Sequence, residues 1–299
     1  IHHLNDNDID IILIIDPRKH LKNIKYGAGA VQRYIWLKNK KAIVVHRINE
    51  CDERKNTKFM NLLLRMTNDC ADHTVFVGTW LKKLKVWNRN DQQASVILNG
   101  SNKDIFNSKK SSLWNNKKIL KIVTHHWSSN INKGFDIYKY LDDLLDKKKW
   151  KKRIEFTYVG NIPKNFKFRN TNLIEPKKDN ELSVILKNNH IYLTASINEP
   201  GGNHQNEGGM CGLPLLYRDS GCMQEYCEGF GASFQNKKDF LEALNMITIN
   251  YPTFKSKMKD FNRDINKTTK SYIKLFNLLI YSKNETIKKR RYIKNPIKF

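Results

Sequence analysis

Short apolar runs alternate with longer amphipathic stretches through most of this chain of 299 residues. The apolar runs have the length of buried strands, and the stretches between them place apolar residues at helical spacing. In the first third, strands are expected at 9–15, 41–46, 73–78 and 94–100, and helices at 57–71 and 79–87. Parallel strands need such helical crossovers, so the alternation predicts an α/β fold with parallel sheets.

A polar stretch at 101–118, "SNKDIFNSKKSSLWNNKK", interrupts this alternation and is interpreted as an interdomain linker. The pattern then resumes, with strands expected at 119–126, 153–161, 190–196, 213–218 and 229–234 and helices at 132–148, 180–188, 236–249 and 253–281. We therefore predict one βα domain over 1–107, a second over 108–281, and a basic, frayed tail over 282–299. Ligands of such sheets bind at the carboxyl ends of the strands, here in a cleft between the two domains.

The net charge of +25, from 54 Lys+Arg against 29 Asp+Glu, is compatible with nucleic acid, an anionic membrane or phosphate-bearing substrates. The lysines are scattered among Asn and Ile, and no RNA-binding sheet signature, helix-turn-helix or zinc-finger spacing is present. We therefore expect no nucleic-acid partner. Peripheral contact with an anionic membrane stays open, because a basic domain suits such a surface.

Cysteine usage and the apolar runs indicate a cytoplasmic protein. The five cysteines are an odd number with no Cys-x-x-Cys pair, which favours reduced thiols over a disulfide framework or a metal site. No apolar run is long enough to span a membrane, and the opening "IHHLNDND" has no secretory signal pattern. The first residue is not methionine, so we expect a fragment or a trimmed start.

The segment "IYLTASINEPGGNHQNEGGMCGLPLLYRDSG", beginning at Ile191, carries the strongest chemical signal. A buried strand is followed by Glu199, then Pro200 and two glycines, and then a short helix that contains Glu207. Glycines let the backbone approach a ligand, and the amides at a helix start bind phosphate. Because Glu207 lies one turn inside the helix, its carboxylate can accept ribose hydroxyls. These features fit a ligand with a central diphosphate and hydroxyls on both sides, and helix capping alone would not explain the double glycine.

Glu-x7-Glu followed by "CGLPLLYRDSG" resembles the retaining glycosyltransferases of family 4, which have the GT-B fold of two Rossmann-like domains facing a cleft. Three further segments are similar to the same family: "HHWSSNINKGFDIY" (125–138) with its Lys-Gly pair, "VILNGSNKDIF" (96–106), and "VVHRINECDERKNT" (44–57) followed by "TVFVGTWL" (74–81). The likeness covers most of residues 40–280. The glycine-rich first loop of the family is not matched, since "YGAGAVQRY" (26–34) offers only Gly-x-Gly, so the N-terminal domain is expected to be shortened.

The resemblance implies a metal-independent transfer of a hexose from a nucleotide-diphosphate sugar to an acceptor hydroxyl, in a glycan or a lipid-linked acceptor, with retention. Lys133 and the amides of Gly201, Gly202 and Asn203 would bind the diphosphate, Glu199 the donor sugar, and Glu207 the ribose. His46 would face the cleft near the donor phosphate and the acceptor. A loop arginine of many family members is absent here, where His125, His126, Trp127 and Asn130 stand instead; Asn130 and His126 are candidate donor contacts.

Other interpretations remain open at this point. Glu199 and Glu207 could serve a glycoside hydrolase, which needs two carboxyl groups across the scissile bond, but the Gly-Gly helix start would then have no purpose. A truncated, catalytically inactive module that binds a nucleotide sugar or a glycan is the main alternative. Near His46, the residues Arg47, Glu50, Asp52 and Arg54 would bind the acceptor or simply pair with one another.

Overall fold

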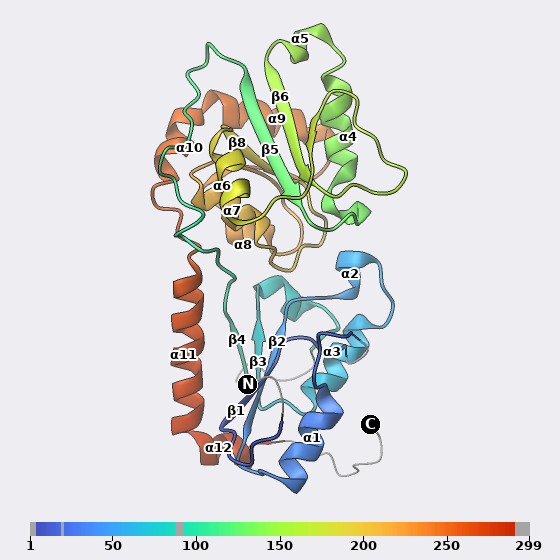
Figure 1. Ribbon diagram of the computed structural model, residues 1–299, viewed down its shortest axis with the longest axis vertical. Helices are drawn as coiled ribbons and strands as arrows, with labels where there is room; N and C mark the ends of the chain where they lie inside the picture. Colours follow the sequence, from blue (N-terminus) through green and yellow to red (C-terminus); the bar gives the residue numbers. More distant parts are fainter. Residues whose placement is uncertain (1–3, 19–20, 88–92, 291–299) are drawn as a thin grey trace. The chain divides into compact units, whose positions relative to one another are not determined.

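The structure is a computed structural model that describes residues 4–18, 21–87 and 93–290 (Figure 1). The chain forms two compact units, one from residues 1–98 with 268–299 and the other from residues 99–267. Each unit contains one sheet whose strands are all parallel. The predicted α/β architecture with parallel sheets is therefore confirmed.

The first unit has a four-stranded sheet in the order β1-β2-β3-β4. Its strands are β1 (Ile11–Ile14), β2 (Ile43–Ile48), β3 (His73–Phe76) and β4 (Ala94–Val96). Its helical elements are α1 (Ala28–Leu37), α2 (Asp52–Lys55), α3 (Met60–Asn68), the 3-10 helix η1 (Thr79–Lys83), most of α11 (Ile265–Tyr281), and α12 (Lys283–Lys288).

Both faces of the first sheet are buried, as the near-continuous apolar runs of parallel strands require. Val44 packs in a cluster with α1, whereas its neighbours Ile43 and Val45 pack in a second cluster with Leu275 and Leu279 of α11. Successive side chains of a strand point to opposite faces, so α1 and α11 cover opposite sides of the sheet. Figure 1 shows α11 and α12, in red, beside the blue strands.

The second unit has a six-stranded sheet in the order β10-β9-β8-β5-β6-β7. Its strands are β5 (Leu120–His126), β6 (Ile154–Gly160), β7 (Asn172–Ile174), β8 (Ile191–Thr194), β9 (Leu215–Arg218) and β10 (Gly231–Phe234). Its helical elements are η3 (Ile131–Lys133), α4 (Phe135–Leu144), α5 (Lys148–Lys151), α6 (Asp179–Lys187), α7 (His204–Met210), α8 (Met223–Cys227), α9 (Lys237–Ile249) and α10 (Tyr251–Lys257). The core contains a continuous set of buried side chains from β5, β6, β8, α4 and α9.

The expected domain boundaries need correction at both ends of the second unit. We placed the first boundary after residue 107, but the structure places it after Leu98. The stretch 101–118 is no free linker, because Phe106 is buried and Ser183 donates a hydrogen bond from Oγ to the carbonyl of Ile105. At the other end, residues 268–281 belong to the first unit, because Leu275 of α11 packs on its sheet.

The expected basic tail over 282–299 begins instead with the helix α12. Beyond it, Arg290 donates hydrogen bonds to both carboxylate oxygens of Asp72, each at 2.8 Å, and further ones to the carbonyls of Lys40 and Ala42. Asp72 is fully buried in this ion pair. Residues as far as Arg290 are thus anchored to the first unit, and 291–299 lie outside the described residues.

Two other expectations differ from the structure. The helix expected over 253–281 is two helices, α10 and α11, and the one expected over 79–87 is the short 3-10 helix η1. The segment with Gly27 and Gly29, which offered only Gly-x-Gly, leads into α1, where Val31, Tyr34 and Ile35 are buried. Of the described helices, none is both long and apolar enough to cross a bilayer.

Candidate functional site

The order of the strands in the second unit fixes where a ligand site can form. From β5 the chain moves outward through β6 to β7, then returns to β8 and moves outward on the other side through β9 to β10. The sheet therefore changes direction between β5 and β8, and ligands of such sheets bind beyond the carboxyl ends of the strands at this point. The segments that follow β5 and β8 carry Lys133, Glu199 and Glu207.

Lys133 and Glu199 form a buried ion pair at this switch point. The Nζ atom of Lys133 lies 2.5 Å from Oε2 of Glu199, and the two residues are only 7% and 1% exposed. Lys133 ends the 3-10 helix η3, and Gly134 follows it with φ 98°, a conformation that favours glycine. A Cβ atom at Gly134 would lie 2.4 Å from the backbone of Ala195, so glycine is also needed for close packing.

Glu207 is the centre of a second polar contact between the two strand ends. Its Oε2 atom lies 2.6 Å from Nε2 of His125, the penultimate residue of β5. Nδ1 of the same ring lies 3.1 Å from the hydroxyl of Tyr192 in β8. The Glu207 side chain keeps 20% of its surface exposed, more than either member of the Lys133–Glu199 pair. Glu207 is therefore held in place by β5 while part of its carboxylate remains accessible to solvent.

In the turn from Pro200 to Asn203, between the two glutamates, the carbonyl groups of Gly201 and Gly202 accept hydrogen bonds. Asn99 donates from Nδ2 to the carbonyl of Gly201, and Gln205 donates from Nε2 to that of Gly202, each at 2.5 Å. Within the described part of the chain, no protein acceptor pairs with the amides of Gly201, Gly202 and Asn203. A Cβ atom at Gly202 would lie 2.5 Å from Nδ1 of His204, so this turn has no room for a larger residue.

Two buried histidines pack beneath this turn. His204 accepts or donates a hydrogen bond at 2.8 Å with Oγ1 of Thr194, and His126 does so at 2.7 Å with the hydroxyl of Tyr138. Their ring centroids are 4.6 Å apart. Burial, followed by electrostatic interaction with His204 and with Lys133, holds the pKa of His126 well below its usual value. His126 is therefore neutral at pH 7 and packs in the floor of the site, where it is 4% exposed.

The structure assigns Asn130 a local role. Its Oδ1 atom accepts a hydrogen bond from the amide of Asn132 at 2.9 Å, which caps the helix η3 that ends at Lys133. Asn130 thus positions the segment that carries Lys133, and a contact with a donor sugar stays a prediction. Trp127, in the same loop, is 61% exposed.

His46 belongs to the first unit, where it lies within β2 and is fully buried. Its Nδ1 atom is 2.7 Å from Oδ1 of Asn68, and within the described residues its Nε2 atom has no hydrogen-bond partner. Burial lowers the pKa of His46 to about 4, so the ring is neutral at pH 7. Of the charged residues nearby, Glu50 pairs with Arg54 at 3.2 Å and with Lys55 at 2.9 Å.

The structure thus brings together five of the expected residues, Lys133, Glu199, Gly201, Gly202 and Glu207, with Asn203 at the start of α7. Sequence reasoning missed three contributors to the same site, namely Asn99, Tyr192 and His204. Asn99 and His204 lie inside segments that we had singled out, "VILNGSNKDIF" and "EPGGNHQNE", so their polar character in these loops was a usable signal. Tyr192 lies in a buried strand, where nothing in the sequence separates it from a core residue.

No known protein family and no curated protein matches this chain in sequence. The chain is similar in structure, however, to a glycosyltransferase from Rickettsia africae, with a TM-score of 0.63 and 14% identity over 91% of this chain and 77% of the other. It is also similar to Anabaena HepE in complex with UDP, with a TM-score of 0.66 and 13% identity over 90% and 79% of the two chains.

A third similar structure is the catalytic domain of starch synthase IV from Arabidopsis thaliana bound to ADP and acarbose, with a TM-score of 0.62 and 12% identity over 91% of this chain and 73% of the other. Identities this low establish the fold and nothing finer. Together with the two parallel sheets, the comparisons show that the chain has the GT-B fold, with two Rossmann-like units.

Proposed function

We propose that this protein is a retaining glycosyltransferase that moves a sugar from a nucleotide-diphosphate sugar to an acceptor hydroxyl, in a glycan or a lipid-linked acceptor. The observation that supports it best is the pairing of Lys133 with Glu199 and of His125 with Glu207 at the switch point of a GT-B unit. Solved structures of similar fold contain UDP or ADP, which is the nucleotide part of such a donor.

In this proposal, the diphosphate lies against the turn between the two glutamates. The amides of Gly201, Gly202 and Asn203 point donors at it, and the ammonium group of Lys133 supplies a full positive charge. The carboxylate of Glu207 accepts hydrogen bonds from the ribose hydroxyls. The carboxylate of Glu199 does the same for hydroxyls of the transferred sugar, while it holds Lys133 in position.

The reaction breaks the bond between the anomeric carbon and the diphosphate oxygen and forms a bond from that carbon to the acceptor oxygen. Negative charge builds on the leaving diphosphate, and fixed donors stabilise it without reorganisation. Attack from the same face as departure gives retention, and the departing phosphate oxygen accepts the acceptor's proton. Because the protein's own donors supply this stabilisation, we propose a metal-independent reaction and expect turnover to persist in EDTA.

The contacts of the two glutamates also argue against the glycoside hydrolase interpretation. A glycosidase needs one carboxyl group that is protonated and another that is free to act as nucleophile or base. Glu199 instead contacts an ammonium group, and Glu207 contacts an imidazole ring. Both carboxylates are thus engaged as partners of other side chains, and this supports a ligand-positioning role and transfer over hydrolysis.

Turnover is the test that separates an enzyme from a binding module. Purified protein is incubated with UDP-, GDP- and ADP-sugars and with simple glycoside acceptors, and the release of free nucleoside diphosphate is measured. We expect acceptor-dependent release with one nucleotide class and loss of release in Lys133→Met/Glu199→Gln, which removes both charges together. The matched control is Lys139→Met, since Lys139 is paired with Asp143 on the exposed surface of α4. Donor binding without any acceptor-dependent release would instead identify an inactive module.

A further inference from the structure

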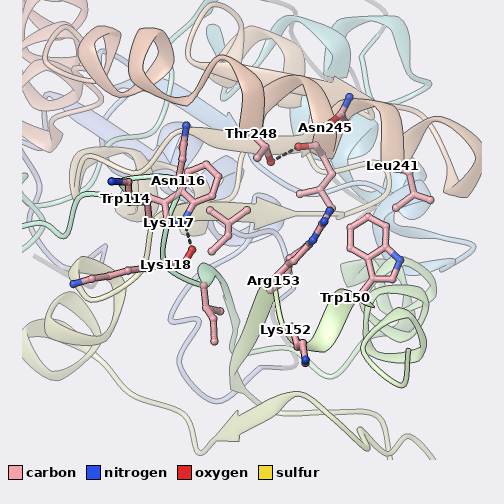
Figure 2. Close-up of a pocket in the computed structure, with 14 residues that line it drawn as sticks. Trp114, Asn116, Lys117, Lys118, Trp150, Lys152, Arg153, Leu241, Asn245 and Thr248 are labelled. Atoms are coloured by element: carbon pink, nitrogen blue, oxygen red, sulfur yellow. Dashed lines mark hydrogen bonds between the residues drawn. The ribbon is translucent and has the colours of Figure 1, made fainter. Parts of the chain in front are cut away.

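The second unit contains a cavity of about 480 Å³ at the amino-terminal ends of strands β5 and β6 (Figure 2). Leu120 and Ile154, the first residues of β5 and β6, are register partners and form part of its floor with Leu244 of α9. All three side chains are buried. The Lys133 site lies at the opposite ends of the same strands, and a seven-residue strand is roughly 20 Å long. The cavity is therefore separate from the site described above.

Four cations line this cavity: Lys117, Lys118, Lys152 and Arg153. All four are exposed, and no Asp or Glu is among the lining residues. Among the described residues, none of the four side chains takes part in an ion pair. Unpaired cations around one opening produce a local positive potential, which favours an anionic partner.

Two tryptophans stand among these cations and give the cavity an amphipathic character. Trp114 donates from Nε1 to the carbonyl of Lys118 at 2.7 Å and packs edge-on against Tyr251, so its ring is fixed. Trp150 is half-buried, and Figure 2 shows its ring beside Leu241 and Arg153. Indole rings with one apolar side and one side exposed to water are favoured at membrane–water interfaces.

The basic and apolar character extends beyond the cavity itself. Residues 147–153 read KKKWKKR, so that every residue of this exposed segment except Trp150 is Lys or Arg. On α9, Leu241 and Asn245 line the cavity, and Ile249, one turn further on the same row of the helix, is 68% exposed. Ile119, beside the lysines, is 42% exposed. Exposed aliphatic side chains among clustered cations match a partner that has both anionic and apolar layers.

We propose that this face of the second unit docks on an anionic phospholipid bilayer, with the four cations contacting lipid phosphates and the indole of Trp150 inserting at headgroup level. Charge complementarity supports this occupant, because a cluster of four to eight Lys/Arg residues next to aromatic side chains is the pattern that anionic headgroups attract. The inference does not rest on the proposed transferase activity. Since the docking face and the Lys133 site lie at opposite ends of the same strands, bound lipid leaves that site accessible.

Vesicle co-sedimentation tests this proposal. The full chain is mixed with vesicles of phosphatidylcholine alone or with about 30% phosphatidylglycerol, an anionic lipid of the kind that attracts polybasic segments. We expect binding to the anionic vesicles only, weakened by added salt. The variant K117Q/K118Q/K152Q/R153Q should bind roughly a hundredfold or more weakly, because each cation near such a surface contributes about a fivefold change in affinity.

The matched control is K164Q/K167Q/K237Q/K238Q, which removes the same charge from exposed lysines elsewhere in this unit. It should bind the anionic vesicles nearly as wild type does. Equal loss in the two variants would overturn the proposal, because net charge alone would then explain the binding. Circular dichroism of both variants verifies folding, which we expect because the substituted side chains are exposed.

Two further measurements distinguish a lipid bilayer from a soluble phosphate as the ligand of this face. Vesicles containing brominated lipid should quench the tryptophan fluorescence of wild type more than that of Trp150→Phe, since the bromine must approach Trp150. Equal quenching in the two proteins would contradict insertion at this point. Calorimetry with glycerol phosphate and with inorganic phosphate covers soluble ligands. Saturable binding of either, lost in the quadruple cavity variant and accompanied by no vesicle binding, would overturn the bilayer as the occupant.

Discussion

The Nζ atom of Lys133 lies 2.5 Å from Oε2 of Glu199, although 66 residues separate them in the chain. The two residues reach each other because β5 and β8 are neighbours in the sheet and each delivers one residue beyond its carboxyl end. Taking two charges out of water is costly, and the cost is offset only by the other charge and by further polar contacts. A buried ion pair therefore does not by itself indicate that it stabilises the fold. It is better evidence for a site that needs an ammonium group in a fixed position.

Removing one member of this pair should cost more stability than removing both. Lys133→Met removes the ammonium partner of a buried carboxylate, and Glu199→Leu removes the carboxylate partner of a buried ammonium group, so we expect a loss of about 3–5 kcal/mol in the free energy of unfolding for each. The double variant Lys133→Met/Glu199→Leu should recover most of this loss. Urea denaturation of the four proteins gives the coupling energy. Additive losses in the double variant would show that the two charges do not interact.

A methyl group at Gly134 should disrupt the turn that follows Lys133. Gly134→Ala forces alanine into a left-handed conformation, φ 98°, and places its Cβ 2.4 Å from the backbone of Ala195. Gly229 is the control, because it also has positive φ, 85°, but has open space around it. We expect about 1–2 kcal/mol of destabilisation for Gly229→Ala and clearly more for Gly134→Ala. Equal thermal midpoints for the two variants would mean that the contact with Ala195 relaxes without cost.

The C-terminal segment should stabilise the first unit through Arg290. Its partner Asp72 is fully buried, so Arg290→Met leaves an uncompensated carboxylate, and we expect a loss of about 3 kcal/mol in urea denaturation. Arg169 pairs with Asp143 and Asp146 on the surface and serves as the control. Arg169→Met should leave the denaturation midpoint nearly unchanged. If Arg290→Met also left the denaturation midpoint unchanged, the segment after α12 would contribute nothing to the stability of this unit.

Mild acid should destabilise the protein through its buried histidines. Burial holds the pKa of His46 at about 4 in the folded state, below the ordinary 6.5 of the unfolded chain. The unfolded state therefore binds more protons between pH 6.5 and 4, and stability present above pH 6.5 is lost as the pH falls through this window. The loss from His46 is on the order of 3 kcal/mol when the window has been crossed.

The slope of stability against pH is the useful measurement here, since His73 and His190 have pKa values lowered to about 4 in the same way. Unfolding free energies of wild type and His46→Gln are compared at pH 5, 6 and 7. The slope of the variant should be smaller by most of a proton between pH 5 and 6, or roughly 1 kcal/mol per pH unit, and by less between pH 6 and 7. Identical slopes in the two proteins would place the pKa of His46 near its ordinary value.

Much of the fold could be predicted from the sequence because parallel strands are short apolar runs with buried faces. "KAIVVH" and "ILKIVTHH" correspond to β2 and β5, and the break between two sets of strands is real. Strand β7 was missed, because its three residues contain no apolar run and Leu173 is 44% exposed. The membership of α11 in the first unit was also missed. Periodicity shows that Leu275 and Leu279 share a face, but not which sheet covers that face.

The local geometry of the candidate site could be predicted where neighbouring residues in sequence carry it, and was missed where the fold joins distant residues. Glycines next to Glu199 indicated a turn that approaches a ligand, and that turn is tightly packed against His204. The contact of His125 with Glu207 could not be predicted, since 82 residues separate them and no local pattern links the two. For the same reason, the capping of the segment before Lys133 by the Asn130 side chain was not predicted, and a donor contact of Asn130 stays a prediction.

Equilibrium binding of nucleotide-diphosphate sugars, measured by calorimetry and by thermal shift, tests the central claim most directly. We expect one of UDP-, GDP- or ADP-glucose to bind and to raise the melting temperature. Glu207→Gln should weaken that binding about 10- to 100-fold, because it removes a charged acceptor for ribose hydroxyls. Glu242→Gln, at an exposed position of α9, should bind as wild type does. Binding that is absent across the panel, or equally strong in both variants, would contradict the assignment of a donor site between Glu199 and Glu207.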